Sequence, residues 1–181
     1  TVTLGAKALF FNTAGYQGGS VVCIGSDKFF IAYTADVGGY MYGRVASVSG
    51  TTVTFGTQIV INSAQTYLGK KGLAYSSTTD AIAMIAHYSS VNYLWRFTVS
   101  GTTITNDTSA KVTLTSVLND GAGSGTTSQI VRNTTTDELF VAWKKSAGGS
   151  AAYGGVIEMA AGGGSGSFTG GSAVAFTSNL K

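Results

Sequence analysis

Short hydrophobic runs separated by glycine-rich or polar turns follow one another along the whole chain. Two of these runs, Y-G-R-V-A-S-V and T-V-T-F-G-T-Q-I-V-I, flank the dipeptide Ser49-Gly50. Runs of about four to eight β-branched and aromatic residues on either side of a tight turn are typical of a β-hairpin. The sequence therefore predicts two antiparallel strands, Tyr42–Val48 and Thr52–Ile61.

The same hairpin recurs further along the chain. The run Y-L-W-R-F-T-V-S-G-T-T-I-T begins at Tyr93, 51 residues after Tyr42, and a looser copy begins at Tyr153. Each copy follows a short strand and then a strand predicted to be buried on both faces, K-F-F-I-A-Y-T, A-I-A-M-I-A-H or E-L-F-V-A-W-K. Alanine and methionine favour helix, but the place of A-I-A-M-I-A-H in the repeat predicts a strand. A period near 50 residues is typical of stacked or circular arrays of small sheets.

Three units of four antiparallel strands, each about 50 residues long, are typical of β-propeller blades. The predicted units are residues 16–65, 66–122 and 123–181, whereas residues 1–15 match only the second half of the hairpin, as an outer strand without its own sheet. Known propellers close with about four to eight blades. We therefore expect an all-β fold whose ring is incomplete in one chain, to be completed by further propeller blades or by a homo-oligomer.

Composition agrees with an all-β fold and narrows the possible functions. Of 181 residues, 44% are hydrophobic and only 10% are charged, with 26 Gly and no Pro, which argues against disorder. The formal net charge of +3 comes from scattered basic residues, so nucleic-acid binding, which needs a clustered patch, is not expected. No run of about 18 apolar residues is present, so no membrane insertion is expected. Low charge suits an extracellular assembly.

Cys23 is the only cysteine, which excludes an internal disulfide. It stands within the apolar run V-V-C-I and is predicted to be a buried structural thiol. The single histidine, His87, has no triad or metal-ligand spacing around it. The turn aspartates Asp27, Asp80 and Asp137 each precede a buried strand and are expected to stabilise their turns. Neither enzymatic activity, a metal nor a cofactor is predicted.

Two rows of aromatic side chains are predicted when the units are aligned. The first ends the buried strands and the second begins the next strands, where side chains face the clefts between blades. An aromatic ring offers a flat apolar face to a sugar, and its OH or NH can form hydrogen bonds. Packing between the blades is the simpler interpretation, and carbohydrate binding is the alternative. The first row is Tyr33, His87 and Trp143, and the second is Tyr42, Tyr93 and Tyr153.

The hairpin V-S-G-T-T-V-T-F-G-T, the following I-V-I-N-S-A and the strand F-F-I-A-Y-T resemble degenerate β-propeller repeats of bacteriophage virion proteins, notably tail-fibre and receptor-binding parts. The resemblance covers nearly the whole chain and is weakest in the third unit. It implies a non-enzymatic structural or binding component, in a virion or extracellular, that takes part in host or glycan attachment. Two alternatives stay open: a free-standing propeller lectin that binds carbohydrate between blades, and a purely structural assembly module.

Overall fold

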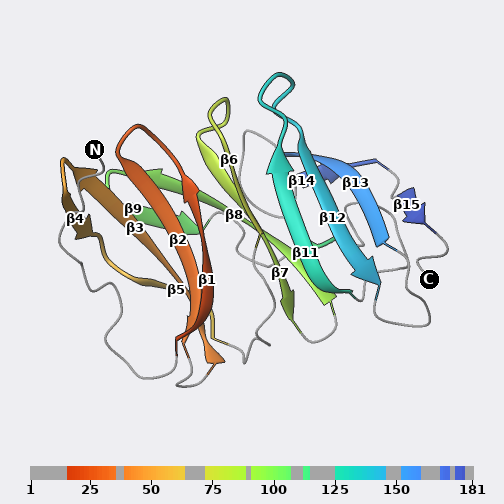
Figure 1. Cartoon of the computed structure of the whole chain (residues 1–181), viewed down its shortest axis with the longest axis horizontal. Helices are drawn as coiled ribbons and strands as arrows, with labels where there is room; N and C mark the ends of the chain where they lie inside the picture. Colours follow the sequence, from red (N-terminus) through yellow and green to blue (C-terminus); the bar gives the residue numbers. More distant parts are fainter. Residues whose placement is uncertain are drawn as a thin grey trace, which may run out of the picture.

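The computed structural model describes residues 16–35, 39–63, 72–88, 91–106, 112–114, 125–145, 152–159, 168–171 and 174–177. Its elements are β-strands arranged in three antiparallel sheets, so the all-β prediction is confirmed (Figure 1). No helix within these ranges is long and apolar enough to cross a membrane. The predicted outer strand in residues 1–15 lies outside the described residues.

Each sheet is built from one continuous stretch of chain. The first contains β1 (Tyr16–Cys23), β2 (Lys28–Ala35), β3 (Met41–Ser49), β4 (Thr52–Phe55) and β5 (Ile59–Asn62). The second contains β6 (Gly72–Ser76), β7 (Ala81–Tyr88), β8 (Val91–Ser100), β9 (Thr103–Asn106) and β10 (Val112–Thr113). The third contains β11 (Gly125–Arg132), β12 (Leu139–Lys145), β13 (Ala152–Met159), β14 (Phe168–Gly170) and β15 (Val174–Thr177). Successive long strands pair as hairpins, as the sequence predicts.

The fourth strand of each sheet is divided into two pieces that pair with the same third strand. The prediction of one continuous strand from Thr52 to Ile61 is therefore wrong. After Phe55, the Gly56 amide donates to the Val45 carbonyl at 2.9 Å, and the next two residues leave the ladder before β5 begins. Strand β1 starts at Tyr16 and accommodates Gly18 through a shift of register between Tyr16 and Gly19.

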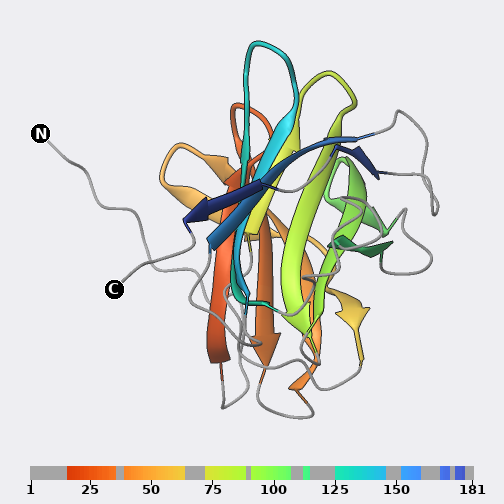
Figure 2. The same cartoon turned by 90° about the vertical axis from the view of Figure 1, so that its right-hand side faces the viewer.

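The three sheets stack in chain order, with the second sheet in the middle. Strand β1 contacts β6, and β6 contacts β11, so the first strands of the sheets lie side by side (Figure 1). The hairpin tips between first and second strands, at residues 24–27, 77–80 and 133–138, all point to one rim, at the top of Figure 1. We call this the first-turn rim. The arrangement is open, with the first and third sheets at its two ends (Figure 1). The view from the third-sheet end shows the sheets one behind another (Figure 2).

Two hydrophobic cores separate the sheets, and β7 contributes to both. Successive side chains of a strand point to opposite faces, and on β7 both faces are buried. Ile82, Met84 and Ala86 belong to the core against the first sheet. Ala81, Ala83 and Ile85 belong to the core against the third sheet. Burial on both faces is thus confirmed for β7, whereas Phe140 of β12 is 37% exposed because β12 is in an end sheet.

Candidate functional site

The third-strand tyrosines occupy equivalent places in the three sheets, as predicted. The residues that pair with these tyrosines on β2, β7 and β12 show which positions form the first aromatic row. The pairs are Tyr42 with Tyr33, Tyr93 with Ala86, and Tyr153 with Trp143. In the first and third sheets the two rings stack, with centroids 5.7 Å apart for Tyr33 and Tyr42 and 5.9 Å apart for Trp143 and Tyr153.

His87 does not belong to the first aromatic row, and this part of the prediction is wrong. Ala86 stands where Tyr33 and Trp143 stand in the other sheets. Tyr33 and Trp143 each follow their turn aspartate by six positions, whereas His87 follows Asp80 by seven. The motif I-A-H therefore lies one residue further along its strand than I-A-Y and V-A-W do. In a strand, one position moves a side chain to the opposite face.

His87 accordingly lies on the face of the second sheet that is turned toward the third, with Asn92 opposite it in the ladder. Burial lowers the pKa of His87 below its ordinary value. Four buried side-chain polar atoms in this region have no hydrogen-bond partner among the described residues. They are Nδ2 and Oδ1 of Asn92, Nδ1 of His87 and Nε1 of Trp143. Because buried polar atoms normally find a partner in protein or ordered water, we expect ordered water here.

The predicted aromatic residues are distributed over different surfaces and do not converge on one site. Trp143 is buried in the core between the second and third sheets, and Tyr93 packs against the core between the first and second. Tyr33 and Tyr42 lie on the face of the first sheet that turns away from the second. Tyr33 is nevertheless fully buried, and its hydroxyl donates to Gln58 Oε1 at 2.6 Å.

Both ends of the stack present exposed apolar side chains. Those on the first sheet are Val21 and Val60, and those on the third are Val131, Phe140, Val156 and Val174. In the third sheet, Val131, Phe140 and Val156 lie directly opposite one another across three strands. A hollow of about 330 Å³ next to Val156 is also lined by Glu138 and Glu158. Contiguous apolar side chains at a surface typically mark an interaction site.

A cavity of about 130 Å³ lies at the first-turn rim between the first and second sheets. Its lining residues come from both sheets and combine apolar, aromatic and oppositely charged side chains. They are Ile24, Lys28, Tyr75, Asp80, Ile82 and Val99. The Tyr75 hydroxyl donates to Asp80 Oδ1 at 2.7 Å. Burial and this hydrogen bond raise the pKa of Tyr75, which keeps the hydroxyl protonated as a donor.

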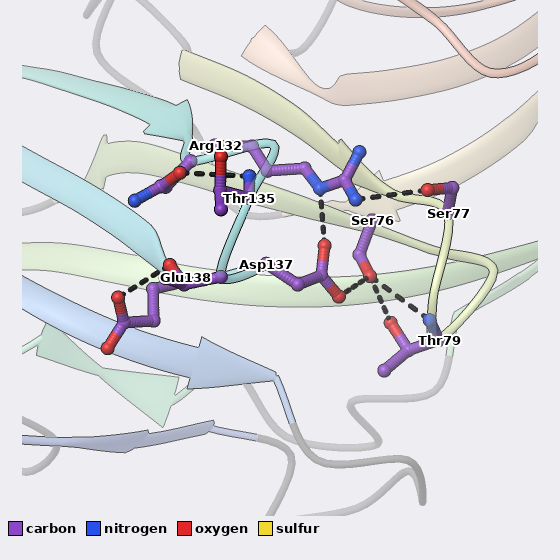
Figure 3. Close-up of polar contacts among 9 residues, drawn as sticks. Ser76, Ser77, Thr79, Arg132, Thr135, Asp137 and Glu138 are labelled. Atoms are coloured by element: carbon purple, nitrogen blue, oxygen red, sulfur yellow. Dashed lines mark hydrogen bonds and ion pairs between the residues drawn. The ribbon is translucent and has the colours of Figure 1, made fainter.

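At the equivalent position between the second and third sheets, hydrogen bonds join the two sheets (Figure 3). The Asp137 carboxylate accepts hydrogen bonds from the Ser76 hydroxyl and from Arg132 Nε. Arg132 Nη2 also reaches Ser77 Oγ at 3.0 Å. Burial acts to raise the pKa of Asp137, but the hydrogen bonds from Ser76 and Arg132 outweigh it, so the pKa lies below its ordinary value. The network therefore holds a charged carboxylate across the sheet interface.

The turn aspartates Asp80 and Asp137 share a left-handed backbone, with φ of 47° and 63°. Aspartate tolerates this conformation because its short side chain can form local hydrogen bonds. Five positions before the aspartate, the second sheet has Tyr75 and the third has Arg132. The two turns thus have the same backbone but different partners for their carboxylates.

At the interface between the first two sheets, Cys23 stands at the position equivalent to Ser76. It stands four positions before Asp27, as Ser76 stands four positions before Asp80. The Ser76 hydroxyl crosses to the next sheet, but the Cys23 thiol donates to the Gly25 carbonyl at 2.8 Å within its own turn. Cys23 is exposed, so the prediction of a buried thiol is wrong.

Within the described ranges, no group of three or more His, Cys, Asp or Glu side chains is placed to hold a metal ion. The first-turn cavity and the two end faces are the candidate sites. In comparisons with known proteins, the chain matches no protein-family model and no curated protein sequence.

Proposed function

We propose that the chain is a non-enzymatic structural and binding component of a larger β-propeller-like assembly, in which its three sheets act as consecutive blades. The observation that carries this proposal is the pair of apolar end faces. A four- or five-stranded sheet with two apolar faces buries them only by stacking against neighbours. The second sheet has both neighbours, and each end sheet has one.

An apolar pair that is buried in the first sheet has an exposed counterpart on the outer face of the third sheet. Phe30 and Val45 are opposite one another in the first sheet and are fully buried against the second sheet. Phe140 and Val156 are the equivalent pair in the third sheet, and they are 37% and 43% exposed. The simplest partner for this surface is another sheet of the same repeat, which would cover the pair as the second sheet covers its counterpart.

The charges at the two ends favour a head-to-tail arrangement. Arg44 lies opposite Ile31 on the outer face of the first sheet. Glu138 and Glu158 line the hollow on the outer face of the third. Opposite charges on the two end faces are electrostatically complementary when one end meets the other.

The resemblance of the hairpin repeats to phage tail-fibre and receptor-binding repeats supports a place in a virion. There the assembly would display a surface for attachment to a host or to its glycans. The same end faces also suit a module whose role is structural alone. The attachment role requires a ligand site within the assembly, whereas the purely structural role does not.

The mass of the chain in solution tests the proposal. Light scattering after gel filtration should give a multiple of 18.4 kDa that decreases on dilution. Val156→Lys should shift the population toward the monomer, because a buried lysine ammonium would lose its hydration. Thr134→Lys, in an exposed turn of the same sheet, is the matched control. A wild-type chain that stays monomeric at high concentration, with no effect of Val156→Lys, would reject self-assembly through this face.

A further inference from the structure

We propose that the cavity at the first-turn rim between the first and second sheets binds a single neutral carbohydrate residue, with Lys28 and Asp80 as its polar contacts and Tyr75 as its aromatic wall. This inference deepens the proposed function by naming a ligand class for the attachment role. The site lies at the opposite end of the hairpins from the aromatic rows that the sequence singled out.

The two charged residues of the cavity come from different sheets and do not neutralise each other. Lys28 and Asp80 both line the cavity, but the described residues show no ion pair between them. The described partner of the Asp80 carboxylate is the Tyr75 hydroxyl, which uses one of its two oxygens. A carboxylate has about four acceptor positions and an ammonium has three donors. The cavity therefore offers both donors and acceptors to a ligand.

A neutral polyol matches this pair of groups better than a charged ligand does. Sugar hydroxyls donate to a carboxylate and accept from an ammonium at the same time. A phosphate would pair with Lys28 but would be repelled by Asp80, and a cation would meet the reverse problem. A single carboxylate is also too few ligands for a calcium or magnesium ion.

The remaining walls suit the carbon face of a sugar ring. Ile24, Ile82 and Val99 are apolar, and the Tyr75 ring adds an aromatic surface. Aromatic rings combine apolar contact area with a hydroxyl that can form hydrogen bonds. The volume of about 130 Å³ lies below the range of roughly 300–1,000 Å³ that holds drug-sized ligands. The cavity therefore suits one ring and not a longer oligosaccharide buried along its length.

The two sheet interfaces differ in the partners of the turn aspartate. Between the second and third sheets, Ser76 and Arg132 occupy the Asp137 carboxylate. Between the first and second, Cys23 stands in place of the serine, and its thiol donates to the Gly25 carbonyl within its own hairpin. The Asp80 carboxylate is thus left facing the cavity instead of a neighbouring sheet.

Titration of the full chain with methyl glycosides of common hexoses and N-acetylhexosamines, followed by ¹H–¹⁵N NMR, tests the inference. Saturable shifts should appear at Ile24, Tyr75 and Val99. Asp80→Asn should weaken the affinity about tenfold, the effect of losing a charged hydrogen-bond acceptor. Asparagine also tolerates the left-handed backbone of this position. Lys28→Met should weaken binding to a similar extent, and Asp27→Asn, the equivalent aspartate outside the cavity, should leave it unchanged.

Three results would overturn the inference. One is the lack of saturable shifts with every glycoside. Another is wild-type affinity in both Asp80→Asn and Lys28→Met. The third is preferential binding of a zwitterion such as glycine betaine, which would assign the site to a charged ligand. The mass of the same samples distinguishes carbohydrate binding from self-assembly. The cavity lies within one chain, so the cavity variants should keep the end faces and the oligomeric mass of the wild type.

Discussion

The Ser76 hydroxyl donates a hydrogen bond to the Asp137 carboxylate across 61 residues of sequence, joining the second sheet to the third. Ser76 is fully buried, and its oxygen also accepts from the Thr79 amide at 3.1 Å. A short polar side chain at the end of β6 thus fixes two things at once: the turn that follows it and the position of the neighbouring sheet.

Ser76→Ala should lower the free energy of unfolding by about 1–3 kcal/mol, since a partly buried carboxylate loses a donor and a buried turn amide loses an acceptor. Urea denaturation monitored by tryptophan fluorescence measures the change. Ser77→Ala removes an exposed contact to Arg132 and should cost less than about 0.5 kcal/mol. Equal effects of the two substitutions would show that the hydrogen bond from Ser76 to Asp137 contributes little to stability.

The acid stability of the fold should depend on Asp137. Hydrogen bonds from Ser76 and Arg132 outweigh burial and hold its pKa below the ordinary value. The stability they contribute is therefore fully present above the unfolded pKa of about 3.9 and is lost as the pH falls through the lower, folded pKa. Asp137→Asn should flatten this part of the stability curve in urea titrations below about pH 5. An unchanged acid limb in the variant would refute the assignment.

His87 should control stability at milder pH, because it is the only histidine of the chain. Burial lowers its pKa, so the unfolded chain binds the proton more readily than the folded one. Stability should be full above the unfolded pKa of about 6.5 and should decrease as the pH falls from there through the folded pKa. Thermal melting of His87→Gln should lack this decrease. A variant that retains the wild-type slope would place the titrating group elsewhere.

Strands β6 and β11 approach so closely at Gly72 that a side chain does not fit. A Cβ added there would lie 2.8 Å from the Ile130 amide nitrogen and 2.9 Å from Ile85 Cγ2. Because a backbone atom moves only with its strand, Gly72→Ala should destabilise the fold by about 1–3 kcal/mol. Gly171→Ala, where nothing lies within 4 Å of the added carbon, is the control for thermal or urea unfolding. Equal stability of the two variants would contradict this packing.

The strands and their repeat were predictable because both depend on neighbours in sequence. Alternation and turn residues located β2, β7 and β12, and the repeat correctly overruled the helix propensity of A-I-A-M-I-A. The divided fourth strand had one local signal, Gly56 within T-V-T-F-G-T-Q-I-V-I, because an isolated glycine in a strand often marks an irregularity. The form of the break was not predictable, since it depends on where the Gly56 amide finds an acceptor.

The misplacement of His87 had a signal in the sequence. The spacing from the turn aspartates and the position of Tyr93 both point to Ala86, but the similarity of I-A-H to I-A-Y points one residue away. Counting from a turn is the better guide in a strand, because each residue reverses the face. The cavity and the bond between Ser76 and Asp137 had no such signal, since both join residues that only the stacking of sheets brings together.

The common orientation of the three sheets bears on how such a chain can change in length. Each described sheet turns the same set of positions toward the sheet before it, as the pairs of Tyr42, Tyr93 and Tyr153 show. A gene duplication or deletion of one whole unit would therefore bring together two faces that already fit. Loss of half a unit would instead bring together two sheet faces that do not meet in the present stack. The number of sheets can thus vary in whole units while each sheet keeps the same face toward the sheet before it.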